Sequence, residues 1–194
     1  MERRRFLAGL CGTGAIATPG CVAGLGERTL PESEVKRDSA GRRALVFRQG
    51  GDEIGHLGVD GRVDAGVIDL STEIWHREGT TVDAIELRLW MPGTGQSPAE
   101  VAVVSPVEGD SSPPPEISLY TPEGKRGTIV SITDLDDLAD ETISTLDLNV
   151  EPGSATATTL IIHATIELTG NGILGPDYTV DGEFQLEYPE RSDQ

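Results

Sequence analysis

The chain has 194 residues and a formal net charge of −18, from 33 acidic and 15 basic residues. Proteins that bind nucleic acid need a basic face, so this excess of carboxylates argues against nucleic acid as a partner. It also disfavours electrostatic binding to anionic lipid. The length allows one well-cored domain together with a short address segment.

Residues 1–20 have the order of an export signal. A basic run, Arg3 to Arg5, is followed by an uncharged stretch of apolar and small side chains. A retained membrane-spanning helix is the strongest alternative, because no charge occurs from residue 6 to residue 26. Six glycines and Pro19 in that window oppose a helix, since Gly costs about 1 kcal/mol and Pro about 3 kcal/mol of helix propensity relative to Ala. We therefore predict a signal peptide.

The start of this segment resembles a twin-arginine export signal, in which two arginines are followed by any residue and then by Phe-Leu. Arg3, Arg4, Phe6 and Leu7 match that pattern at the expected place in the chain. The resemblance implies that the protein is exported across the cytoplasmic membrane.

The end of the segment, from Thr18 to Cys21, resembles a degenerate lipobox, in which a small residue precedes a cysteine that receives a lipid before cleavage. Gly20 fits this pattern, whereas Thr18 and Pro19 depart from it. The resemblance implies a lipid on Cys21 that attaches the protein to the membrane. Ordinary cleavage nearby, or an inert cysteine inside the signal, are the alternatives. Residues 21–42 lack a sustained period and are predicted to form a flexible tether.

From residue 43 onward the dominant hydrophobic period is two, which is typical of half-buried strands. Leu160, Ile162 and Ala164, for example, alternate with a set that includes Thr159, His163 and Thr165. We expect residues 43–190 to form an all-β domain, an antiparallel β-sandwich of immunoglobulin-like architecture with about 8–9 strands, followed by a tail at 191–194. The predicted strands are 44–48, 63–76, 85–91, 99–105, 116–121, 128–133, 145–150, 157–169 and 184–188.

One acidic segment, residues 134–141, breaks the strand pattern and predicts a short helix capped near Asp134. Its carboxylates at Asp134, Asp136, Asp137 and Asp140 also raise the possibility of a calcium loop. The spacing fails, because Leu138 and Ala139 stand where a calcium loop needs an oxygen ligand and a glycine. We expect only weak, diffuse cation binding there and no metal site.

The remaining candidates for chemistry are few. His56, His76 and His163 have no metal-ligand spacing and are interpreted as surface or rim residues. The sequence contains no G-x-S-x-G motif, phosphate loop or dinucleotide fingerprint, so we predict no catalytic residues and no cofactor.

Trp75 and Trp90 each alternate with the apolar set of their own strands. They would form an exposed platform for a ligand or a protein partner if those strands were neighbours; the alternative is that the other sheet or a loop covers them as core. The only two cysteines, Cys11 and Cys21, lie near the start, so the β domain has neither a disulfide framework nor a cysteine-ligated metal.

The charge composition indicates the salt concentration to which the protein is adapted. Without the first 20 residues the net charge is −20, and the basic residues of the whole chain are 13 Arg and only two Lys. Molar salt shortens the Debye length to about 3 Å and screens repulsion between carboxylates. The composition resembles that of secreted proteins of extreme halophiles, the haloarchaeal type in particular, and implies hydrated cations over the acidic surface.

These observations predict an exported, lipid-anchored module with a binding or structural role and no enzymatic activity, on the extracellular face of the cytoplasmic membrane or secreted. The alternative is a secreted, glycosidase-like hydrolase, in which two carboxylates about 5–10 Å apart flank the bond that is cleaved.

Overall fold

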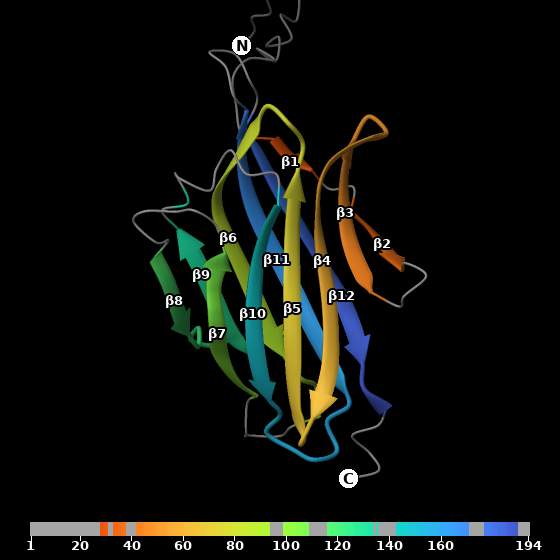
Figure 1. Cartoon of the computed structure of the whole chain (residues 1–194), viewed down its shortest axis with the longest axis vertical. Helices are drawn as coiled ribbons and strands as arrows, with labels where there is room; N and C mark the ends of the chain where they lie inside the picture. The colour runs from red at the N-terminus through yellow and green to blue at the C-terminus, as the bar shows by residue number, and fades with distance from the viewer. Residues whose placement is uncertain are drawn as a thin grey trace, which may run out of the picture.

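The computed structural model describes residues 28–30, 33–37, 42–93, 99–108, 116–133, 135, 143–170 and 177–189. Two six-stranded sheets pack face to face in this part of the chain (Figure 1). The front sheet has the order β2-β3-β4-β5-β10-β7, and the back sheet has the order β1-β12-β11-β6-β9-β8. The strands are β1 (Arg28–Leu30), β2 (Ser33–Arg37), β3 (Arg43–Gln49), β4 (Asp52–Asp64), β5 (Val67–His76), β6 (Thr80–Trp90), β7 (Glu100–Glu108), β8 (Glu116–Tyr120), β9 (Thr128–Thr133), β10 (Ile143–Glu151), β11 (Thr159–Gly170) and β12 (Tyr178–Glu187).

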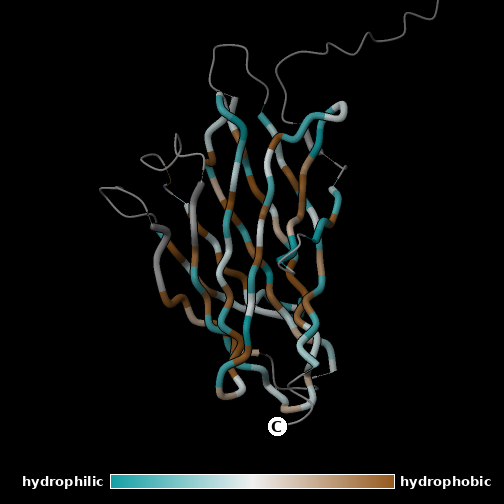
Figure 2. Tube along the Cα trace, turned by 45° about the vertical axis from the view of Figure 1, so that its right-hand side comes forward, coloured by the Kyte–Doolittle hydropathy of each residue, from teal (hydrophilic) through white to brown (hydrophobic). Residues whose placement is uncertain are grey.

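The predicted antiparallel β-sandwich is therefore confirmed, with a larger number of strands. Every pairing is antiparallel except that of β1 with β12, which is parallel. Figure 2 shows the hydrophobic and hydrophilic positions alternating along the strands. Because of this alternation, every second side chain of a strand faces the space between the two sheets. Burial of apolar area there supplies the main driving force for folding.

The core lies between the two sheets. In β11 the inward side chains Leu160, Ile162 and Ala164 are at most 1% exposed, as the period-two pattern predicts. They belong to the same apolar cluster as inward residues of the front sheet such as Leu45 and Phe47, which are fully buried.

The strand predicted over residues 63–76 is wrong, because the chain reverses within it. Asp64 pairs with Val67, so Ala65 and Gly66 form a two-residue hairpin turn between β4 and β5. Both have positive φ, at 48° and 87°, which is the geometry of a type I′ turn. This turn was not predicted from the sequence, because alanine rarely adopts positive φ.

Strand β4 was missed for a related reason. Gly55, Gly58 and Gly61 interrupt it, and a bulge shifts its register with β3 near Phe47. Its apolar residues are therefore unevenly spaced, and a period-two count finds no strand.

The predicted tether, residues 21–42, contains two strands. β1 pairs with β12, and β2 pairs with β3 along its whole length, so the sandwich begins before residue 43. Val35, an apolar residue of β2, is 50% exposed. Backbone pairing at a sheet edge holds this strand without a hydrophobic pattern that a sequence could reveal. The helix predicted at 134–141 lies outside the described residues except for Leu135, which is buried, and the tail at 191–194 also lies outside them.

Candidate binding groove

The outer face of the front sheet is hollowed across β2, β3, β4 and β5. In register, Ala44 of β3 lies beside Gly58 of β4, and Gly58 lies beside Glu73 of β5. Because the two central positions carry almost no side chain, a hollow of about 560 Å³ opens over them. We call this hollow the groove; its lining residues are Lys36, Arg37, Arg42, Arg43, Ala44, Val46, Glu53, His56, Gly58, Val59, Asp60, Ser71 and Glu73.

Gly58 determines the depth of the groove. A Cβ atom at this position would meet nothing closer than 3.7 Å, the carbonyl oxygen of Glu73. The backbone of Gly58 has no positive φ, so a larger residue would fit the strand without strain. The glycine is therefore required neither by packing nor by backbone conformation.

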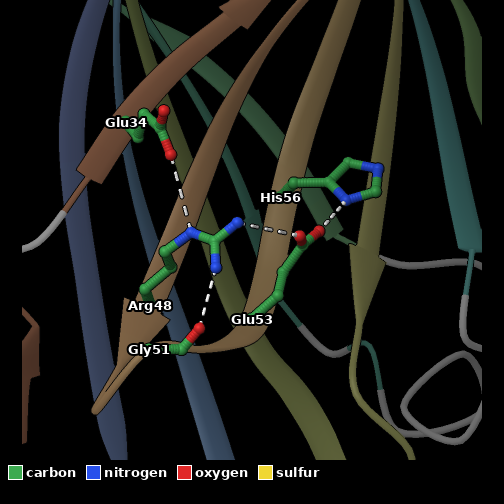
Figure 3. Close-up of polar contacts among 5 residues, drawn as sticks. All are labelled: Glu34, Arg48, Gly51, Glu53 and His56. Atoms are coloured by element: carbon green, nitrogen blue, oxygen red, sulfur yellow. Dashed lines mark hydrogen bonds and ion pairs between the residues drawn. The ribbon is translucent and has the colours of Figure 1, made fainter.

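A polar network borders one end of the groove (Figure 3). Arg48 lies between two carboxylates, with its Nε 3.6 Å from Glu34 and its Nη2 4.0 Å from Glu53, and it donates a hydrogen bond of 2.8 Å to the carbonyl of Gly51. His56 Nδ1 lies 2.8 Å from the other oxygen of Glu53. The network therefore ties edge strand β2 to β3 and β4.

His56 also contacts β5. Its Nε2 lies 3.8 Å from Glu73, and its ring stacks on Trp75 with centroids 5.4 Å apart and planes 21° from parallel. The imidazole thus sits between Glu53 and Glu73 and occupies the indole face that a ligand ring would need.

The opposite end of the groove is cationic. Lys36, Arg37, Arg42 and Arg43 all line it, and they represent four of the 15 basic residues of an acidic chain. Arg42 has a polar partner. Within the described residues, Lys36, Arg37 and Arg43 form no ion pair with a carboxylate. Their positive charge is therefore available to a ligand.

A second hollow of about 500 Å³ adjoins the groove on the same outer face, over β4, β5, β10 and β7. Asp60 and Ser71 line both hollows. The second hollow is acidic, with Asp69 and Asp147 in its wall, and Arg62 lies 3.4 Å from Asp69. The outer face of the front sheet thus changes from cationic at β2 to anionic at β10.

The two tryptophans do not form a platform. Trp75 lies on β5 of the front sheet and Trp90 on β6 of the back sheet, and each points outward and is half-buried. Neither belongs to the core cluster between the sheets, so the alternative of core tryptophans is also wrong. Trp90 instead carries the guanidinium of Arg88 over its ring, 4.6 Å from the centroid, which is a cation–π contact.

The other histidines take different roles. His76 is 2% exposed and its Nδ1 lies 3.0 Å from Thr80 Oγ1, so its assignment to the surface is wrong. Thr80 Oγ1 donates its own proton to the carbonyl of Arg77, which leaves His76 Nδ1 as the donor. His163 lies on the outer face of β11, 3.3 Å from Asp181.

Tyr120 of edge strand β8 carries a perturbed acid group on the back sheet. Its hydroxyl donates a 3.4 Å hydrogen bond to Glu86. Loss of solvent around the hydroxyl and the negative charge of Glu86 raise the pKa of Tyr120 above its ordinary value. This residue is 46% exposed and lies outside any hollow described above.

Several predicted site residues lie outside the described part of the chain: Arg3, Arg4, Phe6, Leu7, Cys21, Asp134, Asp136, Asp137 and Asp140. Among the residues that the structure does describe, no three His, Cys, Asp or Glu side chains are grouped so that they could hold a metal ion. The same residues include no helix that is long and apolar enough to cross a membrane.

Sequence reasoning missed the groove. The available signal was two basic pairs, Lys36-Arg37 and Arg42-Arg43, which lie close together in an acidic chain. The pairing of Ala44 with Gly58 and Glu73 depends on the register of three strands, and the sequence did not predict one of them.

Residues 27–190 match the family described as a domain of unknown function, DUF8121. The chain belongs to this family. No curated protein matches it.

Three solved structures illustrate the similarity of this DUF8121 chain to known domains. The full-length major pilin SpaD of Corynebacterium diphtheriae is 11% identical, with a TM-score of 0.43 over 76% of this chain and 47% of the pilin. The cohesin module of a family 33 glycoside hydrolase from Clostridium perfringens is also 11% identical, with a TM-score of 0.44 over 70% of this chain and 96% of the module. The collagen-binding domain of a Staphylococcus aureus adhesin is 12% identical, with a TM-score of 0.36 over 64% and 95%. The DUF8121 chain thus spans about half the length of the pilin.

Proposed function

We propose that this DUF8121 protein is an exported, non-catalytic binding module that a lipid on Cys21 holds at the outer face of the cytoplasmic membrane. The groove on the front sheet is the observation that carries the binding role. The solvent-facing positions of a sheet ordinarily carry polar or β-branched side chains, which cover its pleated surface. Ala44 and Gly58 leave that surface open instead, and Lys36, Arg37 and Arg43 at its rim form no ion pair with a carboxylate of the described residues.

The alternative, a hydrolase with paired carboxylates, finds its best candidates in Glu53 and Glu73 beside Trp75. The imidazole of His56 lies between these two carboxylates, 2.8 Å from one and 3.8 Å from the other. A glycosidic bond and its attacking water would need that space. The geometry therefore favours a structural role for the two glutamates.

The proposed address depends on the sequence. The DUF8121 match begins at residue 27, beyond both the twin-arginine pattern and Cys21. A family domain that starts after the leader is compatible with a leader that serves only for export and attachment. One acyl chain gives marginal membrane binding, so stable attachment needs more than one chain on the cysteine or a second contact.

Membrane fractionation of cells that make the full chain tests this address. We expect the wild-type protein to sediment with membranes, whereas Cys21→Ser moves it to the soluble fraction or the medium because no lipid can be attached. Cys11→Ser is the matched control, since it changes the other cysteine of the same segment. Equal sedimentation of the wild type and Cys21→Ser would contradict the anchor.

A further inference from the structure

The cationic rim indicates what kind of ligand the groove accepts. Lys36 and Arg37 come from the end of β2, and Arg43 from the start of β3, so the three charges lie at one end of the groove. The rest of the chain carries a large excess of carboxylates. A ligand that is itself acidic is therefore repelled by most of the surface and attracted at this end, which gives charge complementarity at a single place.

The floor of the groove excludes ligands that need a stacking face. Sugar rings are commonly held against exposed aromatic faces, but His56 covers Trp75 on this side of the sheet. Ala44, Gly58 and the buried Val46 offer instead a mostly apolar floor. Such a floor suits the backbone of an extended chain with small side chains.

The β4 and β5 side of the groove, across the strands from the cations of β2, supplies hydrogen-bond acceptors. Asp60, Ser71 and Glu73 line the groove on β4 and β5 and can accept bonds from backbone N–H groups. Strands in a sheet are about 4.8 Å apart, so the groove from β2 to β5 is about 14 Å wide, the length of about four extended residues. A peptide that lies across the strands can thus reach both the rim and the acceptor wall.

We infer that the groove binds an extended acidic peptide segment of a partner protein, whose carboxylates pair with Lys36, Arg37 and Arg43 and whose backbone lies over Ala44 and Gly58. This inference rests on the proposed function, because it names the ligand of the same groove. Acidic polysaccharides and a second copy of this chain are the competing occupants, and the test separates them.

The test is a fluorescence anisotropy titration of the full mature chain with a fluorescein-labelled, eight-residue peptide of alternating Glu and Ser. The same peptide with Gln in place of Glu is the ligand control. We expect saturable binding of the Glu peptide and at least tenfold weaker binding of the Gln peptide. Comparable affinity for both peptides would overturn the inference, because carboxylate pairing would then contribute nothing.

Charge variants test the location of the site. K36Q/R37Q removes two rim cations and should weaken binding by about 5- to 10-fold, since each exposed ion pair contributes only modestly to affinity. K125Q/R126Q removes the same charge from an exposed turn of the back sheet and should leave the affinity unchanged. Equal effects of the two double variants would overturn the assignment to the groove.

A steric variant tests the floor. Gly58→Leu fills the groove without positive φ or a close backbone contact, so it should keep the melting temperature and weaken peptide binding more than tenfold. Gly58→Ala, which adds one methyl group, serves as the milder variant if leucine perturbs folding. Full peptide affinity in the folded Gly58 variants would overturn the inference.

Two further outcomes separate the inference from the proposed function. In the first outcome, the Glu peptide does not bind, but a labelled oligouronate binds or the chain forms a dimer in sedimentation. If Gly58→Leu abolishes that oligouronate binding or that dimer, the peptide is the wrong ligand and the groove remains a binding site. If neither probe binds, no dimer forms, and isolated cell envelopes retain the wild type and Gly58→Leu equally, both the inference and the proposed binding role are wrong.

Discussion

At the scale of single residues, Ala65 stands in a conformation that suits another amino acid. Its φ of 48° lies in the left-handed region, which costs an L-residue about 1–2 kcal/mol. The equivalent turn between β3 and β4 has glycine at both positions, Gly50 and Gly51. The exposed β4–β5 turn is therefore less well matched to its sequence than its neighbour.

Ala65→Asn should stabilise the fold by about 0.5–1 kcal/mol, because asparagine tolerates positive φ and Asn-Gly is a favoured type I′ pair. Ala65→Val should destabilise it, since a β-branched side chain is strained at that φ. Chemical denaturation of both variants measures the change in the free energy of unfolding. A lower stability for Asn than for Ala would show that the turn differs from the one described.

At the scale of strands, two glycines have opposite roles. Gly127 precedes β9 with a φ of 97°, and a Cβ atom there would overlap the carbonyl oxygen of Leu89 in β6. This glycine allows β9 to approach β6 and pair with it. Gly58, in contrast, has open space above it and only ordinary contact distances around it.

Gly127→Ala should lower the free energy of unfolding by at least about 2 kcal/mol, because backbone strain and overlap add. Gly58→Ala is the matched control and should be neutral or stabilising by up to about 1 kcal/mol, since alanine loses less backbone entropy in a strand. Thermal melts of both variants check this. Equal losses of stability would contradict the open floor of the groove.

The strands also set the limit of what the sequence predicts. Regular alternation through Leu160, Ile162 and Ala164 identified β11, and similar alternation identified the second half of β6 and the end of β12. β4 was missed because glycines break its pattern, and β2 because it buries no apolar face. The groove requires the register of both with β3 and β5, so residues as distant as Lys36 and Glu73 meet on one surface through pairing that local patterns do not encode.

At the scale of the whole molecule, the net negative charge determines how stability depends on salt. The net charge is −18, and in dilute salt the excess carboxylates repel one another and destabilise the fold. The ion pairs of the described surface are few and mostly exposed, so they offset little of this repulsion. Screening by molar salt removes that repulsion. We therefore propose that the protein is adapted to high salt, as its composition predicts.

We expect the melting temperature to fall steeply as NaCl is lowered from about 2 M to about 0.1 M, where the Debye length grows from a few ångströms to about 10 Å. Circular dichroism in a salt series measures this. Choline chloride at equal ionic strength should protect similarly if screening is the cause. A melting temperature independent of salt would refute the adaptation.

The proposal that this DUF8121 protein is attached to the membrane outside the cell is tested most directly by the intact mass of the protein extracted from membranes. We expect a polypeptide that begins at Cys21 and carries the added mass of lipid. A mass that retains Arg3 to Arg5, or that begins elsewhere without lipid, would contradict it.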